Sequence, residues 1–531
     1  MKRAAILILI LLMTWCRALD AKTIDLESAT IADIDAAFKA GTLTAEKLVQ
    51  LCLARIHSYD REGPSLHAVM ILNPKAIETA RELDAERKAK GPRSVLHGIP
   101  VVLKDNYNTA DLPTTGGSVL LEGSIPPADA FVVKKLRDAG VIILAKMNMS
   151  EFASPPSRSS LGGQSLNPHD LRRTPAGSSG GTGVGIAAAY APLGMGTDTG
   201  GSIRGPSTAN GIVGLKPTHG LLSRSGIIPL SLTFDTGGPM ARSVSDVAIA
   251  LGAMTGIDPA DAATRKSEGK FSTDYTKDLK TDALKGARIG IARDFLGADP
   301  DVDWVIEASL DAMRKSGATI VDVRFPKWLL DSKLEFYNAI RMPEFAAQIK
   351  DYLSTIGPNY PKTIEDLIER SNRFTAPRAD GARPNPGRWA LFKREASSGS
   401  LEDYRYTSVR DYGLPLVRAT VEGLFTAQKL DAIVYPTSPR RPALLAAPPD
   451  IGPASPTASA TNIANLTGFP DLIVPAGFTG DDLPVGISFL GPAFGEQRLL
   501  SLGYSFEQAT RARRRPAHTP ALEGESISVP E

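Results

Sequence analysis

Glycine is concentrated in one part of this 531-residue sequence, since residues 176–220 contain 13 glycines in 45 positions. Such a density lets the backbone turn sharply and present its N–H groups at close range. Short apolar segments precede and follow this stretch, and helical patterns separate them. Apolar strands that alternate with helices are typical of an α/β sheet that is covered on both faces. We therefore expect an α/β fold.

Hydrophobic periodicity predicts the individual elements. Helical patterns lie near residues 31–39, 45–59, 75–89, 128–139 and 243–255. Short apolar runs that predict buried strands lie at residues 98–103, 141–145, 286–292, 431–435, 472–474 and 485–489. Residues 300–430 are expected to be mostly helical, and the basic, proline-rich tail after Ala509 is expected to be a surface strap.

The N-terminus has the pattern of a signal peptide. Lys2 and Arg3 precede an uninterrupted apolar run, Ala4–Trp15, which is too short to span a bilayer comfortably. Cleavage after Ala18 or Ala21 would remove it. We therefore expect residues 1–21 to be a signal peptide and the mature protein to be secreted or periplasmic, without stable membrane association. The alternative is an uncleaved membrane anchor.

Composition excludes several classes of partner and cofactor. The net charge of +2 is too small to indicate a nucleic-acid partner. The six histidines form no HExxH or similar metal-binding pattern, so we expect no metal and no cofactor. Removal of the signal peptide would leave Cys52 as the single cysteine, and its place in an amphipathic helical pattern predicts a buried packing role.

Three residues are candidates for catalysis: Lys104, Ser178 and Ser202. Lys104 directly follows an apolar run, and both serines lie in the glycine-rich stretch. A serine hydroxyl is a weak nucleophile until a base takes its proton, and a lysine can be that base if burial lowers its pKa. Taken alone, a glycine–serine run is usually a loop or linker, and a lysine after a strand is usually a solvated cap. The hypothesis of a catalytic site therefore depends on the presence of all three residues together, and not on any one of them.

The motifs around these residues resemble those of the amidase signature family. They are Gly98-Ile-Pro-Val-Val-Leu-Lys-Asp-Asn106, Ala176-Gly-Ser-Ser-Gly-Gly181 and Thr197-Asp-Thr-Gly-Gly-Ser-Ile-Arg204. The resemblance extends over about residues 27–512. It implies one large domain, residues 22–531, with a twisted mixed sheet between helices. It also implies a helical substrate-side insertion at about residues 300–430.

The resemblance implies a role for each residue of the motifs. Ser202 would be the nucleophile, Ser178 the bridging serine after a cis peptide bond, and Lys104 the base. The backbone N–H groups of Thr199, Gly200, Gly201 and Ser202 would stabilise the oxyanion, and Asp198 and Arg204 are expected to orient the loop. One departure is Ala176, where many members have glycine.

The function predicted in this way is exported amide hydrolysis. The C–N bond of a small-molecule or peptide carboxamide would be cleaved to a carboxylate and ammonia or an amine, by a monomer or homodimer. One alternative is the amidotransferase A-type subunit of the same family, against which the signal peptide argues. Another is a catalytically dead binding protein on this scaffold, against which the intact lysine and serines argue. Specificity is expected to reside in residues 300–430 and in the loop Tyr435–Ser438.

Overall fold

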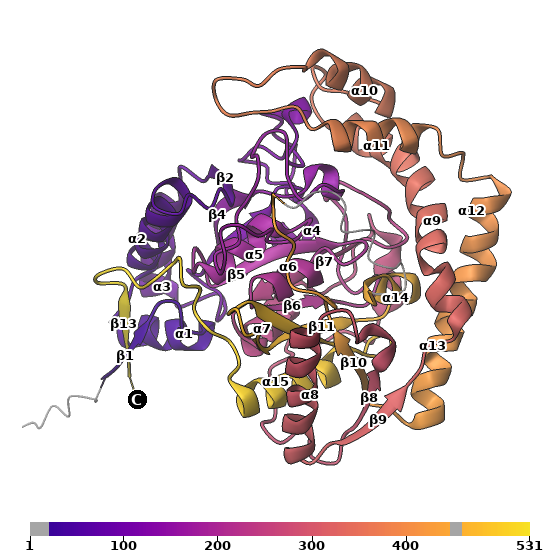
Figure 1. Ribbon diagram of the computed structural model, residues 1–531. Coiled ribbons are helices and arrows are strands. Elements are labelled where there is room, and N and C mark those ends of the chain that lie inside the picture. The colour runs from indigo at the N-terminus through magenta and orange to yellow at the C-terminus, as the bar shows by residue number, and fades with distance from the viewer. Residues whose placement is uncertain (1–20, 447–458, 531) are drawn as a thin grey trace, which may run out of the picture.

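The computed structural model describes residues 21–446 and 459–530, so nearly all of the expected signal peptide lies outside the described residues. An 11-stranded sheet runs through the molecule, and helices cover both of its faces (Figure 1). The order of the strands across this sheet is β2 (Val69–Leu72), β4 (Ile142–Met147), β3 (Pro100–Lys104), β5 (Leu193–Asp198), β7 (Thr236–Ala241), β6 (Val213–Lys216), β11 (Asp471–Phe478), β12 (Pro484–Leu490), β10 (Ala432–Pro436), β8 (Arg288–Ala292) and β9 (Thr319–Val323).

The sheet is mixed, as expected. Strands β4, β3 and β5 are parallel to one another, and so are β10, β8 and β9 at the other end. The strands between these two groups pair in antiparallel fashion. All the strands predicted from apolar runs are present, with ends that differ by at most four residues.

The helices of the structure include the five that were predicted individually and several that were not. They are α1 (Ile31–Ala40), α2 (Ala45–Ile56), α3 (Ala76–Lys90), α4 (Phe131–Asp138), α5 (Gly180–Ala187), α6 (Arg204–Ala209), α7 (Val244–Met254), α8 (Pro300–Lys315), α9 (Lys327–Ser354), α10 (Ile364–Arg373), α11 (Pro386–Ala396), α12 (Tyr404–Ser408), α13 (Leu414–Gln428), α14 (Thr461–Thr467) and α15 (Glu496–Thr510). Helices α5 and α6 pack on one face of the sheet, and α7, α8 and α15 pack on the other. None of the described helices is both long and apolar enough to cross a membrane.

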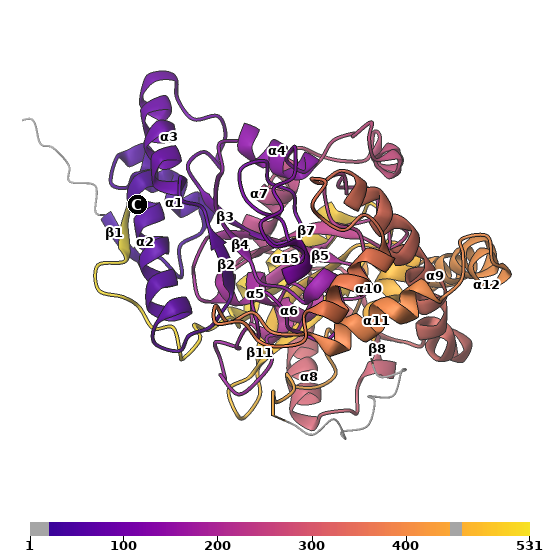
Figure 2. The ribbon, with the colours of Figure 1, turned by 90° about the horizontal axis from the view of Figure 1, so that it is seen from above.

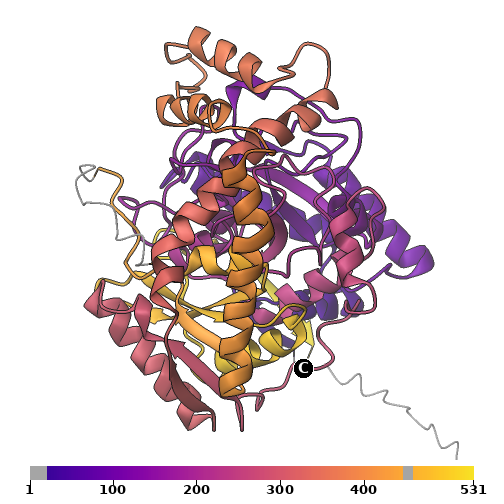
Figure 3. The same ribbon diagram turned by 90° about the vertical axis from the view of Figure 1, so that its right-hand side faces the viewer.

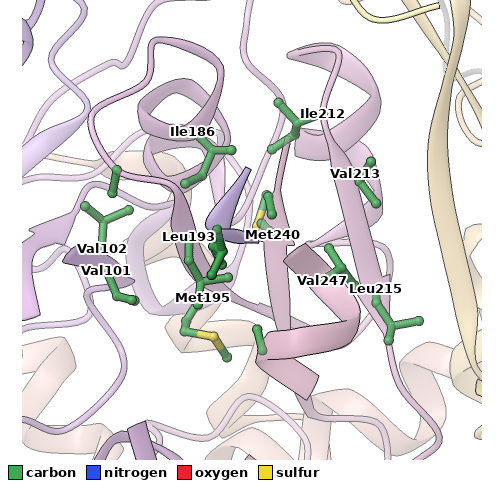
Figure 4. Close-up of a cluster of buried hydrophobic side chains, with 14 of the residues drawn as sticks. Val101, Val102, Ile186, Leu193, Met195, Ile212, Val213, Leu215, Met240 and Val247 are labelled. Atoms are coloured by element: carbon green, nitrogen blue, oxygen red, sulfur yellow. The ribbon is translucent and has the colours of Figure 1, made fainter. Parts of the chain in front are cut away.

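The main core lies where the helices meet the sheet. In Figure 4, Val101 and Met195 from neighbouring strands lie among other buried apolar side chains, with Ile186 of α5 and Val247 of α7. The predicted packing role of Cys52 is confirmed, because the residue is fully buried on α2. Burial raises the pKa of its thiol to about 12, which keeps the thiol protonated.

Two expectations need correction. The segment 300–430 is mostly helical, as expected, but the helical insertion does not include all of it, because β9 forms one edge of the main sheet and the continuous helical part begins with α9. Helices α9 and α13 lie alongside each other at one side of the sheet (Figures 1 and 3), and α10 and α11 lie beside each other beyond them (Figure 2).

The C-terminal tail is more than a surface strap. Its strand β13 (Ser526–Pro530) pairs with β1 (Ala21–Asp25) in a separate two-stranded sheet. Glu525, which precedes β13, forms an ion pair of 2.6 Å with Arg55 of α2, and both side chains are buried. The tail therefore joins the two ends of the described chain.

Candidate active site

The parallel pairing of β3 and β5 brings Lys104 and Thr197 together at the carboxyl ends of these two strands. Leu103 pairs with Met195, so Lys104 at the end of β3 lies level with the last residues of β5. The Lys104 Nζ donates to Ser178 Oγ and to Thr197 Oγ1, both at 2.7 Å. The structure therefore brings Lys104 and Ser178 into direct contact.

The surroundings of Lys104 favour its neutral form. The side chain is fully buried, and burial lowers its pKa to about 7, although the negative charges of Asp198 and Asp235 oppose this shift. Asp105 lies on the other side of the strand, where its Oδ1 is 3.3 Å from Lys146 Nζ. Asp105 therefore points away from Lys104, in keeping with the alternation of side chains along a strand.

The turn before α5 positions Ser178. The peptide bond between Gly177 and Ser178 is cis, as the family resemblance implies. Ala176 has a φ of 60°, in the left-handed region that favours glycine, which accounts for the glycine of many members there. A Cβ atom at Gly181 would lie 2.4 Å from the carbonyl oxygen of Asn148. Only glycine lets the start of α5 come this close to the end of β4.

The loop that carries Ser202 is held by a buried carboxylate. Asp198 accepts the N–H of Gly201 at 2.9 Å and the N–H of Ile203 at 3.0 Å. The Gly201 N–H is therefore engaged by Asp198 in this structure, and it can donate to an oxyanion only by sharing or giving up this hydrogen bond. The N–H groups of Thr199, Gly200 and Ser202 have no hydrogen-bond acceptor in the described ranges, and they remain the candidate donors.

Arg204 connects this loop to β11 of the main sheet. It forms ion pairs with Asp198 at 3.1 Å and with Asp471 of β11 at 2.9 Å, and all three side chains are fully buried. Asn465 also donates to Asp198 at 2.9 Å. Burial alone would raise the pKa of Asp198, but Arg204 holds it well below its usual range. The expected orienting role of Asp198 and Arg204 is confirmed.

Ser178 and Ser202 line one cleft with a volume of about 1010 Å³. Ser179 donates its backbone N–H to the carbonyl oxygen of Ser202 at 3.2 Å, which holds the two segments together. The hydroxyl groups of Ser178 and Ser202, both within the described ranges, make no hydrogen bond with each other. A proton transfer between them therefore requires a rotation of one side chain or the presence of substrate. No metal-binding cluster of histidine, cysteine and carboxylate residues occurs in the described part of the chain.

Two residues in the hydrogen-bond network around Lys104 were not assigned a role in the sequence analysis. Thr197 contacts Lys104, and Asn106 Nδ2 in turn donates to Thr197 Oγ1 at 3.0 Å. Both residues lie inside the motifs. Thr197 is near the end of β5, and Asn106 lies two positions after the end of β3. Asp235 is a third addition: it is partly buried, and it accepts a hydrogen bond from the Thr199 hydroxyl. Burial raises the pKa of Asp235 to about 6.

Comparison with known proteins agrees with this architecture. The family model "Amidase" matches residues 47–500. The chain is 35% identical to the A-type subunit of glutamyl-tRNA(Gln) amidotransferase from Alkalilimnicola ehrlichii, with 91% of this chain and 97% of the relative covered. It is 34% identical to a probable amidase of Arabidopsis thaliana, with 93% and 92% covered. Among solved structures, the native peptide amidase from Stenotrophomonas maltophilia superposes with a TM-score of 0.83 at 36% identity, with 93% of this chain and 99% of that chain covered.

The fold and the motifs thus define a hydrolase with an α/β fold that cleaves amides. The chain belongs to the amidase signature family.

Proposed function

We propose that this protein is an exported amidase that hydrolyses the C–N bond of small or peptide carboxamides through an acyl-enzyme on Ser202. The observation that carries the proposal is the 2.7 Å contact between Lys104 Nζ and Ser178 Oγ in the wall of the cleft that also contains Ser202. A buried lysine with a pKa of about 7 is the group in this contact that can accept a proton near neutral pH.

The chemistry follows from these groups. Neutral Lys104 takes a proton from Ser178, which takes a proton from Ser202 as the Ser202 Oγ attacks the carbonyl carbon. The N–H groups of Thr199, Gly200 and Ser202 donate to the developing oxyanion. The proton then returns along the same path to the leaving nitrogen as the C–N bond breaks. Water attacks the acyl-enzyme by the same route and releases the carboxylate, so that no cofactor or metal is required.

The size of the cleft and the likeness to a peptide amidase support a peptide amide as substrate. The amidotransferase A-type subunit is the second candidate, since such a subunit is 35% identical to this chain. The apolar run after Lys2 and Arg3 supports export, which does not suit an intracellular subunit. Activity of the isolated chain distinguishes the two functions, because a simple amidase needs no partner subunit.

Ammonia release from a set of peptide amides by the purified chain tests the proposal. We expect turnover by the wild-type chain alone, loss of turnover in Ser202→Ala, and unchanged turnover in Ser354→Ala, which removes an exposed hydroxyl from α9. Both variants should unfold at the wild-type temperature. Activity that appears only with added partner subunits would favour the amidotransferase function instead.

Export is tested separately by mass spectrometry of the natively expressed protein. We expect the mature chain to begin at residue 19 or 22. A cytosolic chain that retains the apolar run would overturn this part of the proposal.

A further inference from the structure

The cleft that contains Ser202 has cationic side chains in its wall and no anionic ones among its described lining residues. The cationic groups are Arg341 of α9, Arg394 of α11 and Arg440, which follows β10. These three arginines come from separate parts of the chain. Three elements that converge on one cleft therefore all bring positive charge to it.

One of these charges is already compensated. Arg341 is buried and forms an ion pair of 2.5 Å with Glu395, and it also donates to Ser154 at 2.6 Å. Its guanidinium is therefore part of the wall, where it shares the Glu395 carboxylate with the buried Arg388. The charges that face a ligand are those of the other two residues.

Arg394 and Arg440 are exposed, and neither side chain forms a hydrogen bond or ion pair with the described residues. The neighbouring Arg441 differs, since it pairs with Asp299 at 2.8 Å and with two further aspartates at 3.1 Å. The backbone at Arg440 is held in place, because Ser438 Oγ donates to the Arg440 carbonyl oxygen at 2.8 Å. The two guanidinium groups are thus available to a ligand in the cleft.

The wall of the same cleft also carries a set of apolar side chains. It includes Leu230, Leu334, Tyr337, Met342 and Leu391. A primary amide releases only ammonia, so almost the whole substrate lies on the acyl side of the scissile bond. An apolar group can fill this wall while a carboxylate farther along the acyl part reaches the arginines.

We propose that the preferred substrates are peptide amides with an apolar residue at the amide end and a carboxylate farther along the acyl side, which Arg394 and Arg440 bind. This rests on the proposed amidase function. Guanidinium groups bind carboxylates through two parallel N–H···O bonds, which adds direction to the attraction of charge.

A matched pair of substrates tests this directly: Ac-Glu-Ala-Phe-NH2 and Ac-Gln-Ala-Phe-NH2 differ in charge but hardly in shape. We expect the wild-type kcat/KM to be about three- to tenfold higher for the glutamyl peptide at low salt, the range of two exposed charge pairs. The ratio should fall with added salt. It should approach one in Arg394→Gln/Arg440→Gln, and fall below one in Arg394→Glu/Arg440→Glu.

The control is Lys393→Gln, which removes a neighbouring exposed charge of α11 that does not line the cleft and should leave the ratio unchanged. Thermal unfolding of each variant separates misfolding from altered preference. Cleavage of both peptides at equal rates by the wild-type protein would overturn this inference and leave the amidase function standing. Cleavage of neither peptide would also overturn this inference, and the amidase function would fall with it only if the wider set of peptide amides is not cleaved either.

Discussion

Lys104 is the side chain on which the proposed chemistry depends most. A lysine with an ordinary pKa would be neutral in about one molecule in a thousand at pH 7.5. Burial lowers the pKa of Lys104 to about 7, so the neutral, basic form predominates above that pH. We predict that kcat/KM rises with pH through an apparent pKa of about 7. A pH–rate profile between pH 5 and 10 measures this.

Substitutions of Lys104 complete this test. Lys104→Ala should lose several orders of magnitude in kcat/KM, and Lys104→Arg should not restore activity, because a guanidinium does not give up its proton. An active arginine variant, or a rising limb centred near 10.5, would show that Lys104 only positions Ser178.

Thr197 is a positioning residue for this base. Its hydroxyl is 2.7 Å from Lys104 Nζ and also accepts from Asn106. We predict that Thr197→Val lowers kcat by about ten- to a hundredfold with little change in KM, because the amine loses the hydroxyl contact that helps to aim it at Ser178. Thr197→Ser should recover most of the rate. Equal losses in both variants would point to a packing role for the side chain instead.

The buried ion pairs that join β5, α6 and β11 are expected to stabilise the fold. Arg204 is buried between two carboxylates, Asp198 and Asp471. Arg204→Met leaves both of these without their cation, and we predict a loss of about 3–5 kcal/mol in the free energy of unfolding. Urea unfolding measures it.

A surface ion pair provides the control for Arg204. Lys134 and Asp138 of α4 pair at 2.6 Å with more than half of each side chain exposed. Lys134→Met should change the free energy of unfolding by less than about 1 kcal/mol. Similar effects of the two substitutions would show that the buried network does not stabilise the loop.

Sequence periodicity predicted the strands that are rich in apolar and β-branched residues, such as β3, and missed others. Strands β5 and β7 were missed because both contain two glycines, which have low strand propensity. The structure explains this composition. A Cβ at Gly194 would lie 2.7 Å from Thr182 of α5, so the strand needs glycine for the helix to pack against it.

The sequence predicts the reacting groups of the site, but it does not predict the contacts that hold these groups in place. Lys104, Ser178 and Ser202 are marked by motifs that a single sequence displays. No motif predicts that the Gly201 N–H donates to Asp198, because any carboxylate in a glycine-rich loop has several backbone N–H groups within reach. Partners such as Asp471 lie more than 260 residues away in sequence and become neighbours only through the order of the strands.

The ends of the chain matter for the stability of the entire domain. Arg55 is fully buried, and Glu525 near the C-terminus is its charged partner. A chain that ends at Arg511 loses this partner and β13, and we predict that its free energy of unfolding falls by at least about 3 kcal/mol. Denaturant titration compares it with Arg514→Gln, which removes an exposed pair of 3.3 Å with Asp482 and a cation–π contact with the Phe478 ring. A truncated chain as stable as the wild type would contradict the proposed role of the tail.

The covalent intermediate is the most direct test of the account as a whole. A fluorophosphonate probe reacts with an activated serine, and fragment mass spectrometry of residues 174–204 can distinguish Ser178 from Ser202. The account predicts one adduct per chain, on Ser202, with no adduct in Ser202→Ala and much slower labelling in Lys104→Ala. An adduct on Ser178 or on a serine outside the cleft, or labelling of Ser202→Ala at the wild-type rate, would contradict it.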